Sequence, residues 1–283
     1  MDELTYQIEA EIEANHWWFV TRRKLLSGII RELRIAADAA ILDLGTSTGT
    51  NLRMLKEMNC HNAIGLDKSE AAIRYCAGKG LGTVEQGDVC DLPFEDERFA
   101  LVLATDIVEH VDDDVRALSE IRRVLAPGGT AVITVPAFES LWGVQDDVSH
   151  HKRRYRKRQL EERMGAAGLE GVEVFYFNYL LFFPIWLARQ LIHLFRLKVQ
   201  NENLVNTSSI NRVLTAIFTL DVHTARWVHA PFGVSILAIA RSGRRVAVGT
   251  PVRVEPPITL AQARSAAAGA YSRTGGPQPA SPR

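Results

Sequence analysis

Residues 41–50 read ILDLGTSTGT, and this stretch decides the fold. The apolar run 39–44 predicts a short buried strand that stops at Gly45, and the run 51–58 predicts a helix. Gly45 permits a sharp turn, and Gly49 lets the backbone approach a ligand closely. Unpaired amides at the start of the helix favour a negatively charged or polar ligand group. We therefore expect a nucleotide-like cofactor at this turn.

The spacing of the glycines narrows the choice of cofactor. A dinucleotide-binding turn has glycine at its first, third and sixth positions, whereas Ser47 and Thr50 occupy the third and sixth positions here. Asp43, two residues before the first glycine, can accept a hydrogen bond from an ammonium group or hold the turn. S-adenosylmethionine carries such an ammonium and pyrophosphate does not, so the turn favours S-adenosylmethionine.

At these positions the chain resembles the class I S-adenosylmethionine-dependent methyltransferases, whose first motif commonly runs Asp-x-Gly-x-Gly-x-Gly. Asp43, Gly45 and Gly49 match this motif, and Ser47 replaces its middle glycine. The resemblance implies S-adenosylmethionine as cofactor and S-adenosylhomocysteine as product. It also implies cofactor contacts from the turn itself, through Asp43, Gly45, Thr46, Ser47 and Gly49.

Later strand ends supply the other expected cofactor residues. Asp67 follows the predicted strand 62–66, about 20 positions after the glycine turn, which suits a bond to ribose hydroxyls, although a helix cap is the commoner role. Lys68 follows it directly. By the resemblance, Asp88 accepts the adenine amino group and Val89 packs on the ring, while Thr105 and Asp106 border the methionine part.

The alternation of strands and helices predicts the fold class. Predicted strands at 83–86, 99–106 and 130–135 follow the first two, with helices between them, which indicates a parallel sheet with helices on both faces. Two more strands are expected at 171–177 and 233–241. The expected fold is α/β: a Rossmann-like, doubly wound, seven-stranded sheet, mostly parallel with the last strand antiparallel, plus a helical insertion between strands 6 and 7.

Four segments are expected from this pattern. Residues 1–37 form an N-terminal helical lid, residues 38–178 and 230–242 form the S-adenosylmethionine-binding domain, and residues 179–229 form the insertion. Residues 243–283 are rich in Pro, Ser, Gly, Ala and Arg and predict a disordered tail.

Two histidine-containing segments are candidates for catalysis. The segment 107–111 resembles the "EHV" segment of many small-molecule methyltransferases, and His110 is either a base or a loop-holding residue. Residues 146–155 resemble the Asp-x-x-x-x-His-x-Arg-Arg-Tyr pattern of a bacterial branch. His151 is the preferred base, with His150 and His110 behind it, because the unperturbed pKa of histidine lies near neutrality.

The substrate is expected to contact this loop and the N-terminal aromatic segment. Arginines there can hold a phosphate or carboxylate. The segment 16–19 reads HWWF and is either a clamp for the first helix or a lid over the site; Asn15 is expected to cap the helix that follows. The expected substrate-binding residues are Trp17, Trp18, Arg22, Arg23, Trp142, Asp146, Arg153, Arg154 and Tyr155.

The insertion begins with ten apolar residues, 179–188, which are too few to span a bilayer. A second amphipathic helix is expected at about 209–228. One interpretation is a helical subdomain packed on the sheet or on a second subunit. The other is an apolar cover for a lipid-like substrate or a peripheral membrane contact through 179–197.

Charge and cysteine content limit which partners and which cellular compartment are expected. Lys plus Arg and Asp plus Glu are both 33, so the net charge is zero and no nucleic-acid partner is expected. Cys60, Cys76 and Cys90 form no CxxC pair, so we expect reduced thiols and no metal. The acidic N-terminal segment lacks signal-peptide character, and a cytoplasmic protein is expected.

Together these patterns predict a class I methyltransferase that acts on a small-molecule or lipid-linked acceptor, with a hydroxyl deprotonated by a histidine as the preferred acceptor group. N- or C-methylation remains an alternative, as does a catalytically degenerate scaffold protein, which Ser47 favours. A nicotinamide-dependent oxidoreductase is disfavoured by the missing glycines at 47 and 50. A base-flipping nucleic-acid methyltransferase is disfavoured because the Asn-Pro-Pro-type motif is missing from the sequence.

Overall fold

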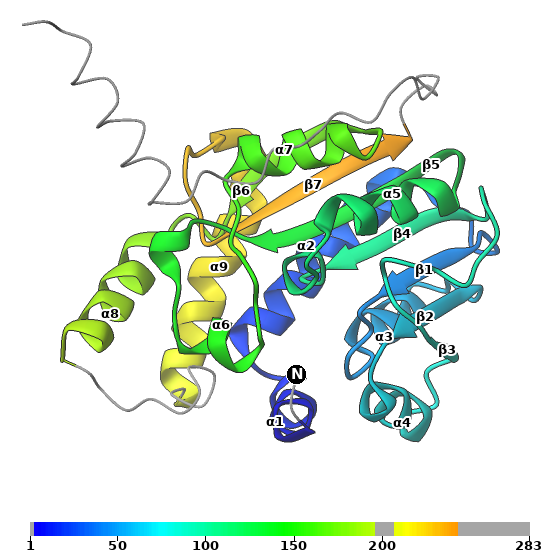
Figure 1. Cartoon of the computed structure of the whole chain (residues 1–283). Helices are drawn as coiled ribbons and strands as arrows, with labels where there is room; N and C mark the ends of the chain where they lie inside the picture. Colours follow the sequence, from blue (N-terminus) through cyan, green and yellow to red (C-terminus); the bar gives the residue numbers. More distant parts are fainter. Residues whose placement is uncertain (1–2, 196–206, 243–283) are drawn as a thin grey trace, which may run out of the picture. The chain divides into compact units, whose positions relative to one another are not determined.

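The computed structural model describes residues 3–195 and 207–242, with a central seven-stranded sheet in the order β3-β2-β1-β4-β5-β7-β6 (Figure 1). Its strand β7 is antiparallel to both neighbours, while the pairs from β3 to β5 are parallel. This confirms the predicted mixed, doubly wound sheet. The predicted tail at 243–283 lies outside the described residues. The strands are β1 Ile41–Leu44, β2 Ala63–Asp67, β3 Thr83–Gln86, β4 Phe99–Thr105, β5 Leu125–Pro136, β6 Leu169–Phe177 and β7 Ser235–Ser242.

Helices cover both faces of the sheet (Figure 1). One core holds apolar residues of α5 and α7, and the other holds those of α2, α3 and α9. The helices are α1 Glu3–Ile12, α2 Trp17–Leu33, α3 Thr50–Glu57, α4 Glu70–Gly78, α5 Asp114–Val124, α6 Val144–Val148, α7 Lys157–Ala166, α8 Phe182–Phe195 and α9 Ser208–Val228, with short 3-10 turns η1 Val108–His110 and η2 Glu139–Leu141.

The position of strand β4 between two hydrophobic cores explains why its sequence is almost continuously apolar. Leu101 and Leu103 enter the core beneath α2 and α9, whereas Val102 and Ala104 enter the core beneath α5. Successive side chains of a strand point to opposite faces, so a strand with helices on both sides needs apolar residues at every position.

The turn after β1 needs both of its glycines. Gly45 has φ +67°, and a Cβ there would lie 2.8 Å from Cδ1 of Ile107. Gly49 has φ +87°, and its Cβ would lie 2.4 Å from Cδ1 of Leu81. Ser47 also has a positive φ, 49°, in the left-handed region that a small polar residue adopts more readily than a branched one. The backbone of the motif is thus retained with serine at its centre.

The aromatic segment before α2 packs against the insertion. The ring of Trp18 is stacked with those of Phe177 and Phe218, at centroid distances of 6.0 and 5.3 Å. The cap of α2 was predicted wrongly: His16, not Asn15, occupies it, and its ring accepts a hydrogen bond from the Trp18 amide. Asn15 instead offers its carbonyl to the side chain of Asn211 on α9.

Helices α8 and α9 lie between β6 and β7 in the chain, where the insertion was expected. The carboxylate of Asp221 on α9 accepts hydrogen bonds from the amides of Asn178 and Leu180, at 2.7 and 2.8 Å, and so ties α9 to the end of β6. Among the described residues, neither helix, nor any other, is both long and apolar enough to cross a membrane.

Candidate active site

A cavity of about 550 Å³ lies at the carboxyl ends of β1, β4 and β5. Open α/β sheets bind ligands at this edge, and the volume falls within the usual range for small-molecule pockets. Elements far apart in the sequence meet in its wall: the glycine turn, η1, the loop around α6, and helices α1, α2, α8 and α9.

Five of the predicted cofactor residues line this cavity: Gly45, Thr46, Ser47, Thr105 and Asp106. Asp43 lies behind them, fully buried, and accepts a hydrogen bond from Nδ2 of Asn51 at 2.8 Å. The same amide nitrogen donates to Oγ1 of Thr105 at 2.9 Å. Burial raises the pKa of Asp43 to about 7. Asp43 therefore holds the turn against β4, the second of the two roles that its position suggested.

Asp67 braces the glycine turn from the neighbouring strand. Its two carboxylate oxygens accept hydrogen bonds from the amides of Ser47 and Ser69, both at 2.9 Å. Asp88, at the end of the next strand, pairs with Lys68 at 3.1 Å on the surface, and Val89 is buried beside it. These four residues lie outside the cavity lining, beyond the turn, so their predicted adenosine contacts stay predictions.

Helix α1 is fastened to the same turn by two carboxylates that the sequence did not single out. Glu9, which lines the cavity, accepts a hydrogen bond from Oγ of Ser47 at 2.7 Å. Glu13 accepts hydrogen bonds from the hydroxyls of Thr48 and Thr50 and pairs with Lys79 at 2.8 Å. Acidic residues on an amphipathic helix usually face solvent, so the sequence carried no signal for this role.

Both arginines predicted near the aromatic segment are already paired. Arg22 lines the cavity and forms an ion pair with Asp106. Asp106 also accepts a hydrogen bond from Oγ1 of Thr134 at 3.1 Å. Arg23 lies off the cavity and donates to the Glu13 carbonyl at 2.7 Å. Trp17 and Trp18 do line the cavity, and their rings pack on Phe218 of α9, so the aromatic segment forms part of the wall of the site.

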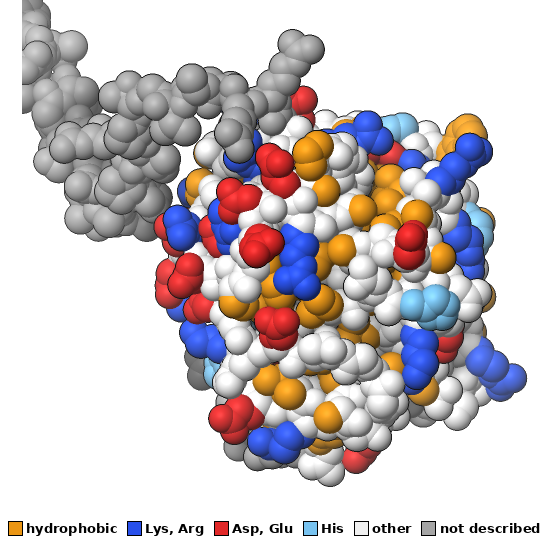
Figure 2. Space-filling view, turned by 90° about the vertical axis from the view of Figure 1, so that its right-hand side faces the viewer, with side chains coloured by type: hydrophobic (Ala, Val, Ile, Leu, Met, Phe, Trp, Pro, Cys, Tyr) orange, Lys and Arg blue, Asp and Glu red, His pale blue; other side chains and the backbone are white. Residues whose placement is uncertain are grey.

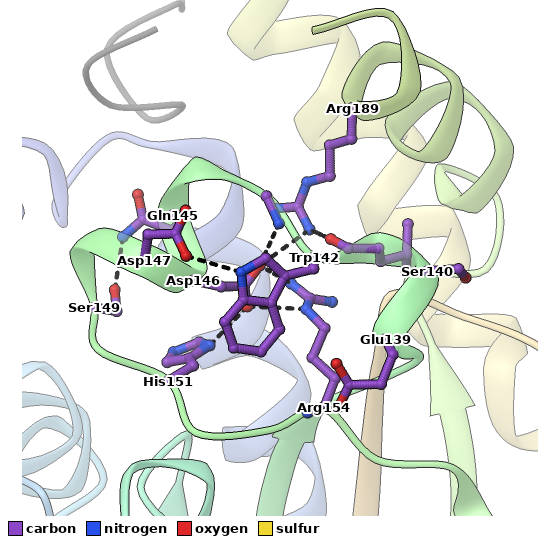
Figure 3. Close-up of polar contacts among 12 residues, drawn as sticks. Glu139, Ser140, Trp142, Gln145, Asp146, Asp147, Ser149, His151, Arg154 and Arg189 are labelled. Atoms are coloured by element: carbon purple, nitrogen blue, oxygen red, sulfur yellow. Dashed lines mark hydrogen bonds and ion pairs between the residues drawn. The ribbon is translucent and has the colours of Figure 1, made fainter. Parts of the chain in front are cut away.

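Asp146 is the centre of a buried polar cluster on the opposite wall (Figure 3). It accepts hydrogen bonds from Nε and Nη2 of Arg154, at 2.9 and 3.0 Å, and lies 3.7 Å from Arg189 of α8. Nδ1 of His151 lies 2.7 Å from Oδ1 of Asp146. Burial alone would raise the pKa of Asp146, but hydrogen bonding to His151 and the charge of Arg154 lower it to about 2.

The ionised Asp146 fixes the tautomer of His151. A carboxylate only accepts hydrogen bonds, so Nδ1 must carry the proton, and Nε2 is left as the basic nitrogen. His151 lines the cavity together with Arg154, whose charge is neutralised by Asp146. The predicted base is therefore oriented by a carboxylate five residues earlier in the chain.

Nε2 of His151 faces two side chains of η1. It lies 3.9 Å from Oε1 of Glu109, and the rings of His151 and His110 meet edge to face at 4.7 Å between centroids. Glu109 is fully buried, and neither carboxylate oxygen has a hydrogen-bond partner among the described residues. Burial raises the pKa of Glu109 well above its usual value and lowers that of His110 to about 4.

The remaining loop residues support the loop and do not line the cavity. Tyr155 is fully buried, and its hydroxyl donates to Asp114 at 2.9 Å, while Arg153 pairs with the same carboxylate at 2.9 Å. The indole nitrogen of Trp142 donates to Asp147 at 2.9 Å. His150 is exposed and has φ 56°. The Arg-Arg-Tyr run thus divides: Arg154 faces the site, and its neighbours anchor the loop to α5.

Sequence reasoning missed Glu109 and Arg189 as cavity residues. Glu109 had a usable signal, because it belongs to the segment 107–111 that resembles the "EHV" segment of many small-molecule methyltransferases. Arg189 had none, since its pairing with Asp146 depends on how α8 packs over the loop.

The described residues fit S-adenosylmethionine. Packing against Ile107 and Leu81 requires glycine at 45 and 49, and this keeps the tight turn whose residues Gly45, Thr46 and Ser47 line the cavity. The cavity begins at that turn and continues to the histidines, which leaves room for an acceptor beyond the cofactor.

Comparisons with known proteins agree with this fit. Residues 42–133 match the family model described as a methyltransferase domain. A protein of Mycolicibacterium smegmatis named as a probable S-adenosylmethionine-dependent methyltransferase is 26% identical over 47% of this chain and 53% of its own length. The demethylmenaquinone methyltransferase of Clavibacter sepedonicus is 34% identical over 36% of this chain and 43% of its own length.

A solved structure shares the fold at low sequence identity. It is the phosphoethanolamine N-methyltransferase 2 of Haemonchus contortus in complex with phosphomonomethylethanolamine and S-adenosylhomocysteine. It is 19% identical, with a TM-score of 0.52 over 78% of this chain and 53% of that one. The matches to the first curated relatives span 36%, 53% and 30% of their lengths, so this chain matches only part of each of these proteins. Together with the glycine turn and the sheet order, the match to the family model identifies residues 42–133 as a methyltransferase domain of the class I, S-adenosylmethionine-dependent type.

Proposed function

We propose that this protein transfers the methyl group of S-adenosylmethionine to a hydroxyl of a small-molecule or lipid-linked acceptor, with His151 as the base. The observation that carries the proposal is the pairing of His151 with the ionised Asp146 at 2.7 Å in the cavity wall. Removal of a hydroxyl proton requires a ring nitrogen that can accept it, and with Nδ1 bonded to Asp146 that nitrogen is Nε2.

S-adenosylmethionine supplies, when bound, a methyl group on a positively charged sulfur, which leaves as the neutral thioether of S-adenosylhomocysteine. Nε2 of His151 takes the proton of the acceptor hydroxyl as the oxygen attacks. Asp146 stabilises the resulting imidazolium and keeps the ring in position. The residues of the aromatic segment, Trp17 and Trp18, help to exclude water from the cavity.

The walls around α8 and α9 support an apolar or amphiphilic acceptor. Ile185, Ala188 and Ile192 of α8 and Leu214 of α9 line the cavity. On the same helix α8, Phe183, Leu187 and Leu194 are exposed. An apolar helix between a substrate cavity and the surface suits delivery of a lipid-linked acceptor from a membrane surface by a peripheral contact. One relative is named as a demethylmenaquinone methyltransferase.

An anionic group on the acceptor has less support than the sequence suggested. Arg22 pairs with Asp106, and Arg154 and Arg189 both face Asp146. An acceptor phosphate or carboxylate would have to compete with these internal carboxylates for the same guanidinium groups.

A small acceptor is favoured over nucleic acid. On the face shown in Figure 2, acidic and basic side chains of the described residues are intermixed, with hydrophobic ones scattered between them. This agrees with the net charge of zero. A continuous basic surface is the usual footprint of a nucleic-acid-binding protein.

The test is a transfer assay with S-adenosylmethionine that carries an isotopically labelled methyl group. Lipid-linked and small hydroxylated acceptors are screened against matched amines and thiols. Label that enters hydroxylated acceptors only, and depends on His151, supports the proposal. Label that enters amines or carbon acceptors, or that is unaffected by His151→Ala, contradicts O-methylation by this base.

A further inference from the structure

The cavity wall holds three side chains with the donor atoms of a metal site. Glu109, His110 and His151 each offer one ligand atom, and these three atoms lie within 4.8 Å of one another. Two of the residues come from η1 and the third from the loop that follows α6. All three line the cavity, so a bound ion would keep a position open to a small ligand.

The carboxylate of Glu109 points independently to a ligand. Its side chain is 0% exposed, and within the part of the chain that the structure describes both of its oxygens lack a hydrogen-bond partner. A buried carboxylate without hydrogen bonds is costly, so such groups are usually paired or coordinate a metal. We propose that Glu109, His110 and His151 bind a first-row divalent cation such as Zn²⁺ or Mn²⁺.

The surroundings of His151 match those of a metal-bound histidine. A ligating imidazole usually donates its other N–H to a carboxylate, which fixes the ring and raises its basicity. His151 does this through Nδ1 to Asp146 at 2.7 Å, and Asp146 is held in turn by Arg154. Nε2 is thereby presented toward Oε1 of Glu109, 3.9 Å away.

Two histidines and one carboxylate form a familiar donor set for ions with an open coordination position. Bonds of about 2.1 Å in a tetrahedral site separate the ligand atoms by about 3.4 Å. The distance of 3.9 Å between Nε2 of His151 and Oε1 of Glu109 is close to this value. All three atoms lie within 4.8 Å of one another, so each pair would have to approach by at most about 1.4 Å to reach this separation.

The inference does not rest on methyl transfer. A bound ion would occupy the same Nε2 that takes a proton in the proposed reaction, so the two roles exclude one another in one molecule at one time. Metal binding is therefore measured without acceptor or cofactor, on tag-free protein that has been treated with a chelator and dialysed.

The test is a titration with Co²⁺, followed by visible absorption, and with Zn²⁺, followed by calorimetry. We expect one ion per chain, with visible bands of nitrogen and oxygen coordination, and we expect Glu109→Gln to weaken Zn²⁺ binding by at least about tenfold. Glu109→Gln keeps the size of the side chain and removes its charge. The matched control is His61→Asn, which alters an exposed histidine elsewhere on the protein and should leave the affinity unchanged.

A second variant keeps the inference testable if Glu109→Gln misfolds. His151→Asn should also weaken Zn²⁺ binding and should remove the visible Co²⁺ bands, while thermal unfolding monitors the fold. Absence of stoichiometric binding, or equal affinities of the wild type and a folded Glu109→Gln or His151→Asn variant, would overturn the site.

Discussion

The carboxylate of Asp146 lies 2.7 Å from Nδ1 of His151 and, because a carboxylate only accepts hydrogen bonds, places a ring proton on that nitrogen. The same carboxylate is held by Arg154 on one side and approached by Arg189 on the other (Figure 3). The candidate base thus depends on residues of the α6 loop and of the insertion, two parts of the chain outside the matched domain at 42–133.

Replacement of His151 tests its role as the base. His151→Ala should lower kcat by about 10²- to 10⁴-fold, the usual contribution of a general base, and leave the Kd for S-adenosylmethionine unchanged. Arg154→Ala should also lower kcat, because it releases Asp146, and should spare the cofactor. Single-turnover rates and calorimetry separate the two effects, with His61→Ala as the control. A loss of cofactor affinity with normal acceptor binding would show that this loop binds the cofactor and not the acceptor.

Removal of Asp146 tests the buried cluster through stability. Asp146→Ala leaves two buried arginines without their counter-charge and should lower the free energy of unfolding by about 3 to 5 kcal/mol. The neighbouring Asp147 is exposed and bonds to Trp142, so Asp147→Ala should cost less than about 1 kcal/mol. Urea unfolding measures both. Equal losses for the two variants would mean that the cluster contributes little.

Asp67 carries the predicted ribose contact. Asp67→Ala should weaken the binding of S-adenosylmethionine by at least ~1.5 kcal/mol, the cost of lost charge-assisted hydrogen bonds. Asp67 also accepts hydrogen bonds from the amides of Ser47 and Ser69. Its loss can therefore destabilise the turn, so the unfolding midpoint must be measured together with the affinity. Asp38→Ala, at an exposed position before β1, is the control. An unchanged affinity would remove the ribose assignment.

The sequence predicted the central sheet and its helices because local sequence patterns determine where these elements form. Apolar runs gave the strands, glycines marked the turn, and the alternation of elements gave the sheet. The parallel order follows from the same rules. The structure confirms all seven strands, including the antiparallel β7, with boundaries shifted by a few residues.

The site was only partly predictable because its contacts join distant segments. His151 and Arg154 were recognised from their motif and do line the cavity. The motif gave no sign that Arg154 donates hydrogen bonds to Asp146, or that the buried Tyr155 donates one to Asp114. Nor does any local pattern reveal that Glu13 of α1 pairs with Lys79 or that Arg189 reaches the α6 loop, since both depend on packing between helices.

The docking of α9 should depend on pH through Asp221. Burial raises the pKa of Asp221 to about 6, although the amides of Leu180 and Asn178 oppose the shift. In the unfolded chain an aspartate has a pKa of about 4. The folded state therefore retains a proton that the unfolded state loses, so stability falls as the pH rises from about 4 to about 6.

Asp221→Asn isolates this effect. The variant keeps an oxygen acceptor and loses the titration, so the wild type should lose about 2 kcal/mol relative to it between pH 4 and pH 7. Chemical unfolding at several pH values measures the difference. Parallel stability curves for the two proteins would show that Asp221 titrates normally.

The most direct test of the cofactor assignment is a calorimetric titration of the purified protein with S-adenosylmethionine, S-adenosylhomocysteine and NAD in parallel. We predict that the first two bind with micromolar Kd, that Asp67→Ala weakens both, and that NAD does not bind. Binding of NAD alone, or of none of the three, would contradict the assignment of this cavity to S-adenosylmethionine.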